Sequence, residues 1–285
     1  GMSGTNGNQE EQWSDRTGPN EPIQRPLAWE HMITMCNELD AEIWINVPHK
    51  ADDHYVRQLA KLIKERLDPE LDCWVEYSNE VWNWARPFPQ SKWVLKNIPG
   101  NNLDTKYANR SSEIFMIFED VFGGLDRLVR VCATQTGRAR TRRRLEHFTT
   151  KPPEGQADVL AITSYFGNGT PANRWIQKNW PVTHQEFADY LKRVEIDKKS
   201  LAGWRAVFRI AARYDVPVVT YESSHHVTGK RFLNEEQREF VRTFYGSAEM
   251  AEAVRYSLDH LDKLGLKLQM AFIDYGYNDD FDHWW

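Results

Sequence analysis

The sequence has few cysteines and no closely spaced pair of them. Its three cysteines are Cys36, Cys73 and Cys132, and no CxxC motif occurs. A disulfide framework or a cysteine-based zinc site needs paired or closely spaced thiols, so we expect neither. Cys73 and Cys132 lie inside apolar runs, which predicts buried free thiols.

Long apolar runs and nucleotide-binding loops are also absent. The chain has no apolar run of the roughly 18 residues that a membrane-spanning helix needs, and no signal segment opens it. We therefore expect no membrane partner. Localisation stays open, and would be secreted or periplasmic if a longer bacterial protein carried a signal. No GxGxxG or GxxxxGK[ST] motif occurs, which removes the usual mark of a nucleotide-binding sheet.

An excess of positive charge is the third absence. The chain carries 36 basic and 41 acidic residues, a net charge of −5, which argues against a general nucleic-acid binder. One basic run, Arg138 to Arg144, is predicted to be a solvated helix face and not a phosphate-binding surface. Aromatic residues are abundant, with twelve Trp, eleven Tyr and thirteen Phe. Trp side chains fill cores, but they also pack against the C–H faces of sugars.

Short apolar segments alternate with helical patterns along the chain. Residues 1–22 are predicted to be disordered or extended, and residues 23–285 to form one domain. Each predicted strand is rich in β-branched or aromatic residues and is followed by polar residues. The six predicted strands are Glu42–Val47, Asp72–Tyr77, Arg127–Ala133, Asp158–Thr163, Val216–Tyr221 and Lys267–Ile273. The predicted helices are Ala28–Leu39, Tyr55–Leu67, Tyr107–Phe122, Leu201–Tyr214 and Glu236–Leu264, the last broken near Gly246.

Alternating strands and helices predict an α/β fold with a parallel sheet, either doubly wound or closed into a barrel. Polar side chains stand at the strand ends, where a (β/α)8 barrel places its active site. They are Asn46, His49, Asn79, Glu80, Gln135, Tyr165, Glu222, His225 and Asp274. We therefore favour a TIM-barrel type. It would be incomplete, with about six of eight βα units, because residues 1–41 contain no convincing strand.

Two of these strand-end residues, Glu80 and Glu222, have the chemistry of a glycosidase. Cleavage of a glycosidic bond passes through an oxocarbenium-like transition state and needs a proton donor and a negative group across the anomeric carbon. Two carboxyl groups about 5–5.5 Å apart supply both in retaining enzymes. A different environment for each would separate the acid from the nucleophile.

The order of these motifs resembles clan A, a large group of retaining (β/α)8 glycosidases. The Asn79-Glu80 pair ends one strand, and Glu222 ends another about 140 residues later. The chain also resembles bacterial cellulase-like members in three sequence segments, which are EYSNEVWN, the earlier NVPH and the later YE…H. The six strands are similar to strands three to eight of that pattern, over residues 25–285. By this resemblance the chain lacks the first two βα units and is a fragment.

The resemblance implies roles for particular residues. Glu80 would be the general acid/base and Glu222 the nucleophile. Asn79 would bind the sugar 2-hydroxyl, and Tyr165 would orient Glu222. The missing units would include an Arg that the clan carries near its nucleophile. The absence of these units would also leave a sheet edge open. Because open edges tend to associate, we expect a homodimer that covers the gap.

Several interpretations stay open beside this one. His49, Trp82 and His225 are candidate sugar-binding residues, but each could instead pack in the core. His49 with Asp52, Asp53 and His54 has metal-ligand atom types, although an Asp pair before a helix is usually a cap, so we predict no metal and no cofactor. The chain is either a retaining hydrolase of β-linked polysaccharide or oligosaccharide, a weak or inactive carbohydrate-binding barrel, or a doubly wound interaction domain.

Overall fold

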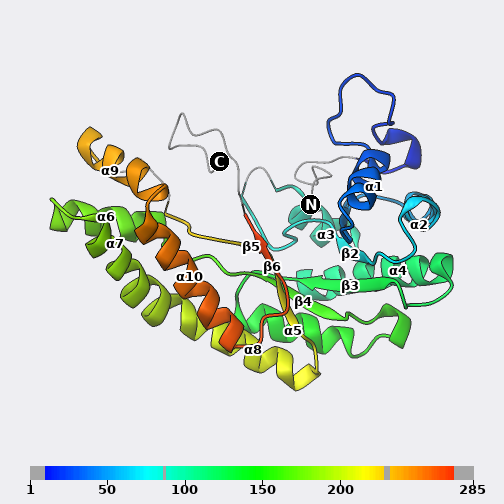
Figure 1. The fold of residues 1–285 in the computed structure, drawn as a ribbon. Coiled ribbons are helices and arrows are strands. Elements are labelled where there is room, and N and C mark those ends of the chain that lie inside the picture. The colour runs from blue at the N-terminus through cyan, green and yellow to red at the C-terminus, as the bar shows by residue number, and fades with distance from the viewer. Residues whose placement is uncertain (1–9, 86–87, 228–231, 273–285) are drawn as a thin grey trace. The chain divides into compact units, whose positions relative to one another are not determined.

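The computed structural model describes residues 10–85, 88–227 and 232–272 (Figure 1). The chain divides into two compact units, which are described separately below. The first unit comprises residues 1–135, 139–161 and 213–216, and the second comprises residues 136–138, 162–212 and 217–285. None of the helices in the described ranges is long and apolar enough to cross a membrane.

The strands form one sheet in which they follow each other in chain order, β1 to β6. They are β1 Ile43–Val47, β2 Cys73–Tyr77, β3 Leu128–Ala133, β4 Val159–Thr163, β5 Val218–Ser223 and β6 Gln269–Ala271. The pairs β1–β2, β2–β3, β3–β4 and β5–β6 are parallel. A doubly wound sheet reverses its strand order at a switch point, whereas a (β/α)8 barrel keeps chain order. The predicted barrel-type α/β fold with six βα strands is confirmed for the described residues, and the doubly wound alternative is wrong.

Helices connect the strands, as parallel pairing requires. The α-helices are α1 Trp29–Glu38, α2 Asp53–Arg66, α3 Gln90–Asn97, α4 Leu103–Phe122, α5 Arg138–Phe148, α6 Gly169–Asn179, α7 His184–Tyr190, α8 Leu201–Ala211, α9 Glu235–Tyr245 and α10 Ala248–Lys263. Three 3-10 helices of one turn are η1 Trp13–Asp15, η2 Pro153–Gly155 and η4 Ala212–Tyr214. A π-helix, η3, covers Leu191–Ser200. The sequence does not predict α3, α6, α7 or η3.

The first unit packs α2 and α4 together beside its strands. On α2, Tyr55, Leu59 and Ile63 recur every four residues and are fully buried, which is the pattern of a helix with one apolar face. The helix begins at the predicted cap, where the Asp52 carboxylate accepts a hydrogen bond of 2.7 Å from the Tyr55 amide. Cys73 is a buried free thiol, as predicted.

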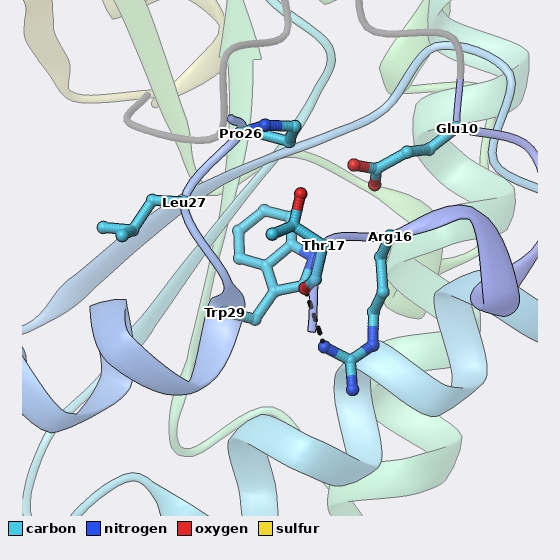
Figure 2. Close-up of a pocket in the computed structure, with 6 residues that line it drawn as sticks. All are labelled: Glu10, Arg16, Thr17, Pro26, Leu27 and Trp29. Carbon is cyan, nitrogen blue, oxygen red and sulfur yellow. Dashed lines mark hydrogen bonds between the residues drawn. The ribbon is translucent and has the colours of Figure 1, made fainter. Parts of the chain in front are cut away.

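Residues 10–22 pack against the rest of the first unit, although the sequence predicts a disordered or extended segment there. The Tyr55 hydroxyl donates a 2.5 Å hydrogen bond to Glu10, and Arg16 pairs with Glu30 at 2.8 Å. Figure 2 shows the small pocket that this segment lines, through Glu10, Arg16, Thr17, Pro26, Leu27 and Trp29. Its two charged side chains are already paired, so the pocket is part of the packing of this segment.

The basic run Arg138 to Arg144 does form a helix, α5, but the prediction of a solvated face is wrong for Arg144. The Arg144 side chain has no exposed surface and pairs with Asp104 of α4. A residue type that normally lies on the surface is here enclosed, because its hydrogen bonds are all made inside the unit.

The second unit has its own core, formed mainly by α6, α7, η3, α8, α9 and α10. Helix α10 packs against both α7 and η3. Several aromatic side chains belong to this core, and Trp175 stacks on Tyr190 with ring centroids 4.6 Å apart. Trp204 and Phe187 are fully buried. Much of the high aromatic content therefore serves packing.

Candidate active site

Glu80 lies in the first unit, three residues beyond the end of β2. Its neighbour across the sheet is the end of β1, where the Asn46 amide donates a 2.8 Å hydrogen bond to the Ser78 carbonyl. The backbone turns sharply at this point, since Ser78 and Glu80 have φ values of 60° and 49°. Left-handed conformations cost a residue with a side chain about 1–2 kcal/mol, so other contacts must hold this turn.

The Glu80 carboxyl group is held by its own loop. It is 8% exposed, and the Asn83 side-chain amide donates a 2.8 Å hydrogen bond to Oε2. The Glu80 carbonyl accepts from the amides of Trp82 and Asn83, and from the Ser91 hydroxyl at 3.4 Å. The turn thus fixes both the backbone and the carboxyl group of Glu80.

Helix α3 supports the same turn from its first residues. The Gln90 side chain donates a 2.6 Å hydrogen bond to the Asn79 carbonyl. Trp82 is half-buried in the loop, and Trp84 two residues later is 48% exposed. Asn79, Glu80 and Trp82 therefore share one loop after β2, as their sequence spacing requires. Their roles towards a sugar stay predictions.

His49 lies two residues beyond the end of β1 and is 1% exposed. Neither ring nitrogen has a hydrogen-bond partner, and the ring meets Trp93 edge-on at 5.5 Å. Burial, with a smaller contribution from the charge of Lys50, lowers the pKa of His49 to about 4. At neutral pH the imidazole is therefore uncharged. Its place in sugar binding stays a prediction, since no described ligand contact tests it.

Glu222 lies in the second unit, within β5 and not after it. The strand runs two residues further than predicted and begins two residues later, beyond Pro217, which has no amide hydrogen for the ladder. Tyr165 follows β4, and the Ser164 amide donates to the Glu222 carbonyl at 3.1 Å. The Tyr165 hydroxyl donates a 3.0 Å hydrogen bond to Glu222 Oε2. This is the contact that a tyrosine would make if it oriented the carboxylate.

The charge state of Glu222 depends on two opposing effects. Burial raises the pKa of the Glu222 carboxyl, and the hydrogen bond from Tyr165 lowers it. Burial also lowers the pKa of His225 to about 4, with His226 adding to the effect, and it lowers the pKa of His226. The two imidazoles are therefore neutral near pH 7. They supply no positive charge to stabilise an ionised Glu222.

The remaining predicted strand-end residues differ in their surroundings. His225 stacks on Tyr245 with ring centroids 5.2 Å apart, and its Nδ1 is buried without a hydrogen-bond partner. Gln135 is exposed. Asp274 lies outside the described residues. Within the described ranges, no group of three or more His, Cys, Asp or Glu side chains gathers as metal ligands.

Some residues of the site were not identified from the sequence. Asn83, which binds the Glu80 carboxyl, belongs to the same EVWN motif and could have been found from its spacing. Gln90 and Ser91 could not, because they reach the turn only through the unpredicted helix α3. The buried Arg144 carried no signal, since Arg142 and Arg143 before it are basic and exposed.

The fold and these strand ends define an α/β protein of the barrel type with glutamates at the carboxyl ends of β2 and β5. No family model matches the sequence, and no curated protein does either. Among solved structures, an endo-β-1,4-mannanase double mutant from Cellulomonas fimi is 12% identical with a TM-score of 0.42, covering 77% of this chain and 40% of its own. A structure of fungal β-1,4-galactanases is 13% identical with a TM-score of 0.35, covering 92% and 82%.

The chain thus spans less than half the length of the mannanase structure. Both TM-scores lie below 0.5. The fold assignment therefore rests on the strand order and on parallel pairing, and not on these similarities.

The buried His49 generates a prediction about stability and pH. Its folded pKa, about 4, lies below the ordinary histidine value of 6.5, so the unfolded chain binds the proton more readily. The stabilisation is fully present above pH 6.5 and is lost as pH falls towards 4, by roughly 2–3 kcal/mol. We expect His49→Gln to reduce the dependence of the free energy of unfolding on pH between 6.5 and 4, as measured by urea unfolding followed by tryptophan fluorescence. The exposed His54→Gln is the control and should leave it unchanged; an unaltered slope in His49→Gln would contradict the prediction.

Proposed function

We propose that the protein is a retaining glycoside hydrolase acting on β-linked polysaccharide or oligosaccharide. In this proposal Glu80 is the general acid/base and Glu222 the nucleophile. The observation that supports it most is the pair of glutamates at the carboxyl ends of β2 and β5, in a parallel sheet of barrel order. Active sites of barrel enzymes lie at that end of the strands. The two carboxyl groups carry the acid, base and nucleophile, so the proposal needs no metal or organic cofactor.

The surroundings of each glutamate are consistent with separate roles. Glu80 is largely buried and its carboxyl group is held in place by the Asn83 amide, which suits a group that must stay aligned with the leaving oxygen. Glu222 receives the phenolic hydrogen bond of Tyr165, which favours the ionised form that a nucleophile needs. Asn79, Trp82, His49 and His225 are the proposed sugar-binding residues.

A second candidate function is a carbohydrate-binding barrel with weak or no catalysis. The observation that favours it is the burial of Glu222, which raises the pKa of its carboxyl group and so works against the ionised form that a nucleophile needs. Among the described residues no Lys or Arg forms an ion pair with Glu222 to offset its burial. Calorimetric titration with oligosaccharides, with product formation followed in parallel, separates the two functions. Binding without hydrolysis by the wild-type protein would favour the second.

Azide rescue tests the two catalytic assignments. We expect Glu222→Ala and Glu80→Ala each to lose turnover by orders of magnitude on a panel of aryl β-glycosides. With azide added, Glu222→Ala should release the α-glycosyl azide, because azide replaces the nucleophile in a single displacement. Glu80→Ala should release the β-glycosyl azide, because azide attacks the glycosyl-enzyme without needing a base.

The exposed Glu236→Ala on α9 is the matched control and should keep wild-type turnover. Wild-type turnover in Glu222→Ala would overturn the nucleophile assignment. An α-azide from Glu80→Ala would overturn the acid/base assignment.

Removal of the Tyr165 hydroxyl should shift the acid limb of the pH profile. In Tyr165→Phe the carboxylate loses its donor, so the pKa of Glu222 should rise further and a smaller fraction should be ionised at a given pH. The acid limb of kcat/KM, which reports groups of the free enzyme, should move to higher pH. Tyr256→Phe, whose hydroxyl binds Asp197, is the control. An unmoved acid limb in Tyr165→Phe would show that the hydrogen bond does not tune Glu222.

We also propose self-association through the edge strand β1. This strand has a described neighbour, β2, on one side, and unpaired strand edges tend to associate. Its Trp44 is half-buried and stacks on Trp74 at 5.1 Å. A symmetric dimer is the simplest assembly. Sedimentation equilibrium at micromolar concentration should give twice the mass of the chain, and a strictly monomeric mass would contradict this proposal.

A further inference from the structure

Arg144 of α5 is a charged side chain with no exposed surface. Removing a guanidinium group from water costs several kcal/mol unless its N–H groups are paired. The contacts of Arg144 therefore indicate which parts of the first unit depend on it.

These contacts converge on the strand ends. Arg144 Nε pairs with Asp104 Oδ1 at 3.1 Å, in the first turn of α4. Nη1 donates to the carbonyl of Ala133, the last residue of β3. Nη2 donates a 2.6 Å hydrogen bond to the carbonyl of Val81. The guanidinium carbon lies 3.9 Å from the ring centroid of Tyr107, whose hydroxyl accepts from the Ala133 amide.

Asp104 balances the buried charge and is itself only slightly exposed. Its carboxylate also accepts from Arg143 Nε at 2.7 Å and lies 3.5 Å from Arg140 Nε. Arg143 is nearly half-exposed, and the hydrogen bond to the Val81 carbonyl comes from Arg144. Arg143 and Arg144 thus share one carboxylate, but it is Arg144 that reaches the loop after β2.

Val81 directly follows Glu80, whose backbone has the left-handed φ of 49°. Such strain persists only where the surroundings hold the backbone in place. On one side of the turn, Gln90 holds the Asn79 carbonyl. On the other side, Arg144 holds the Val81 carbonyl. The peptide group before Glu80 and the one after Val81 are therefore both tied to neighbouring helices.

We infer that Arg144 is a positioning residue for Glu80, fixing the Val81 peptide so that the Glu80 carboxyl group keeps its place at the end of β2. This inference rests on the proposed role of Glu80 as general acid/base. Arg144 itself touches no substrate; it acts through the backbone. A planar fork is required, because one side chain must reach two carbonyls and a carboxylate at once, and a lysine ammonium lacks that geometry.

The test compares Arg144→Lys with Arg143→Gln, which removes the other close arginine from Asp104 and leaves the Val81 contact. Hydrogen exchange should be faster in a peptide covering residues 78–83 of Arg144→Lys, because the amides of Trp82 and Asn83 bind the Glu80 carbonyl in this turn. Exchange in Arg143→Gln should match wild type. Equal exchange in all three proteins would overturn the inference, whatever the activity of the protein.

Turnover of two kinds of substrate distinguishes positioning of Glu80 from a general structural role of Arg144. A displaced general acid slows substrates whose leaving group needs protonation, so kcat on an unactivated oligosaccharide should fall by about 10- to 100-fold in Arg144→Lys, with KM little changed. An aryl glycoside with an acidic phenol needs no protonation, so its glycosylation should be nearly unaffected. Equal losses on both substrates would overturn the inference. No hydrolysis by wild type would reject the proposed function but leave the exchange result decisive for positioning.

If Arg144→Lys does not fold, the double variant Arg144→Gln/Asp104→Asn removes both charges of the buried pair. The same local increase in exchange is expected. Failure of this variant to fold as well would show that Arg144 supports the whole unit, and would overturn its local role.

Discussion

Parallel pairing of the strands in chain order is the constraint on which the rest of the structure depends. Each parallel pair needs a crossover connection, which fixes a helix between successive strands. It also points every strand in the same direction, so that the segment after β1 and the segment after β2 meet at one edge. The hydrogen bond from Asn46 to the Ser78 carbonyl follows from this register. Polar residues that are far apart in the sequence can therefore build one surface.

The strands could be predicted because they are short apolar runs between polar segments. The starts of β1 to β4 differ by one residue from the predicted ones, and their ends coincide. The shift at β5 has a local cause, since Pro217 cannot join the ladder and the polar Glu222 and Ser223 extend it. Periodicity cannot anticipate such polar strand residues. It also cannot predict the π-helix η3, whose hydrogen-bond pattern depends on packing in the second unit.

The residues of the candidate site that lie at strand ends could be predicted from the sequence. Glu80, Glu222 and Tyr165 were identified there, and the last two are hydrogen-bonded. Two of the residues that support the turn at Glu80 were not, because they approach it from helices. Gln90 comes from α3 and Arg144 from α5, and a sequence pattern classes both residue types as exposed. Their burial depends on tertiary contacts that place a carbonyl or a carboxylate opposite them.

The two glutamates are held in different ways, and the difference has a physical origin. Glu222 sits within a strand, so its backbone is fixed by the ladder and only its charge state needs support, which Tyr165 supplies against the cost of burial. Glu80 sits in a strained turn, so its backbone needs support first. That support comes from hydrogen bonds to the carbonyls on either side, including one from a buried charge. A buried guanidinium is stable only while all its partners stay in place, so α4, α5 and the ends of β2 and β3 are coupled through the same few atoms.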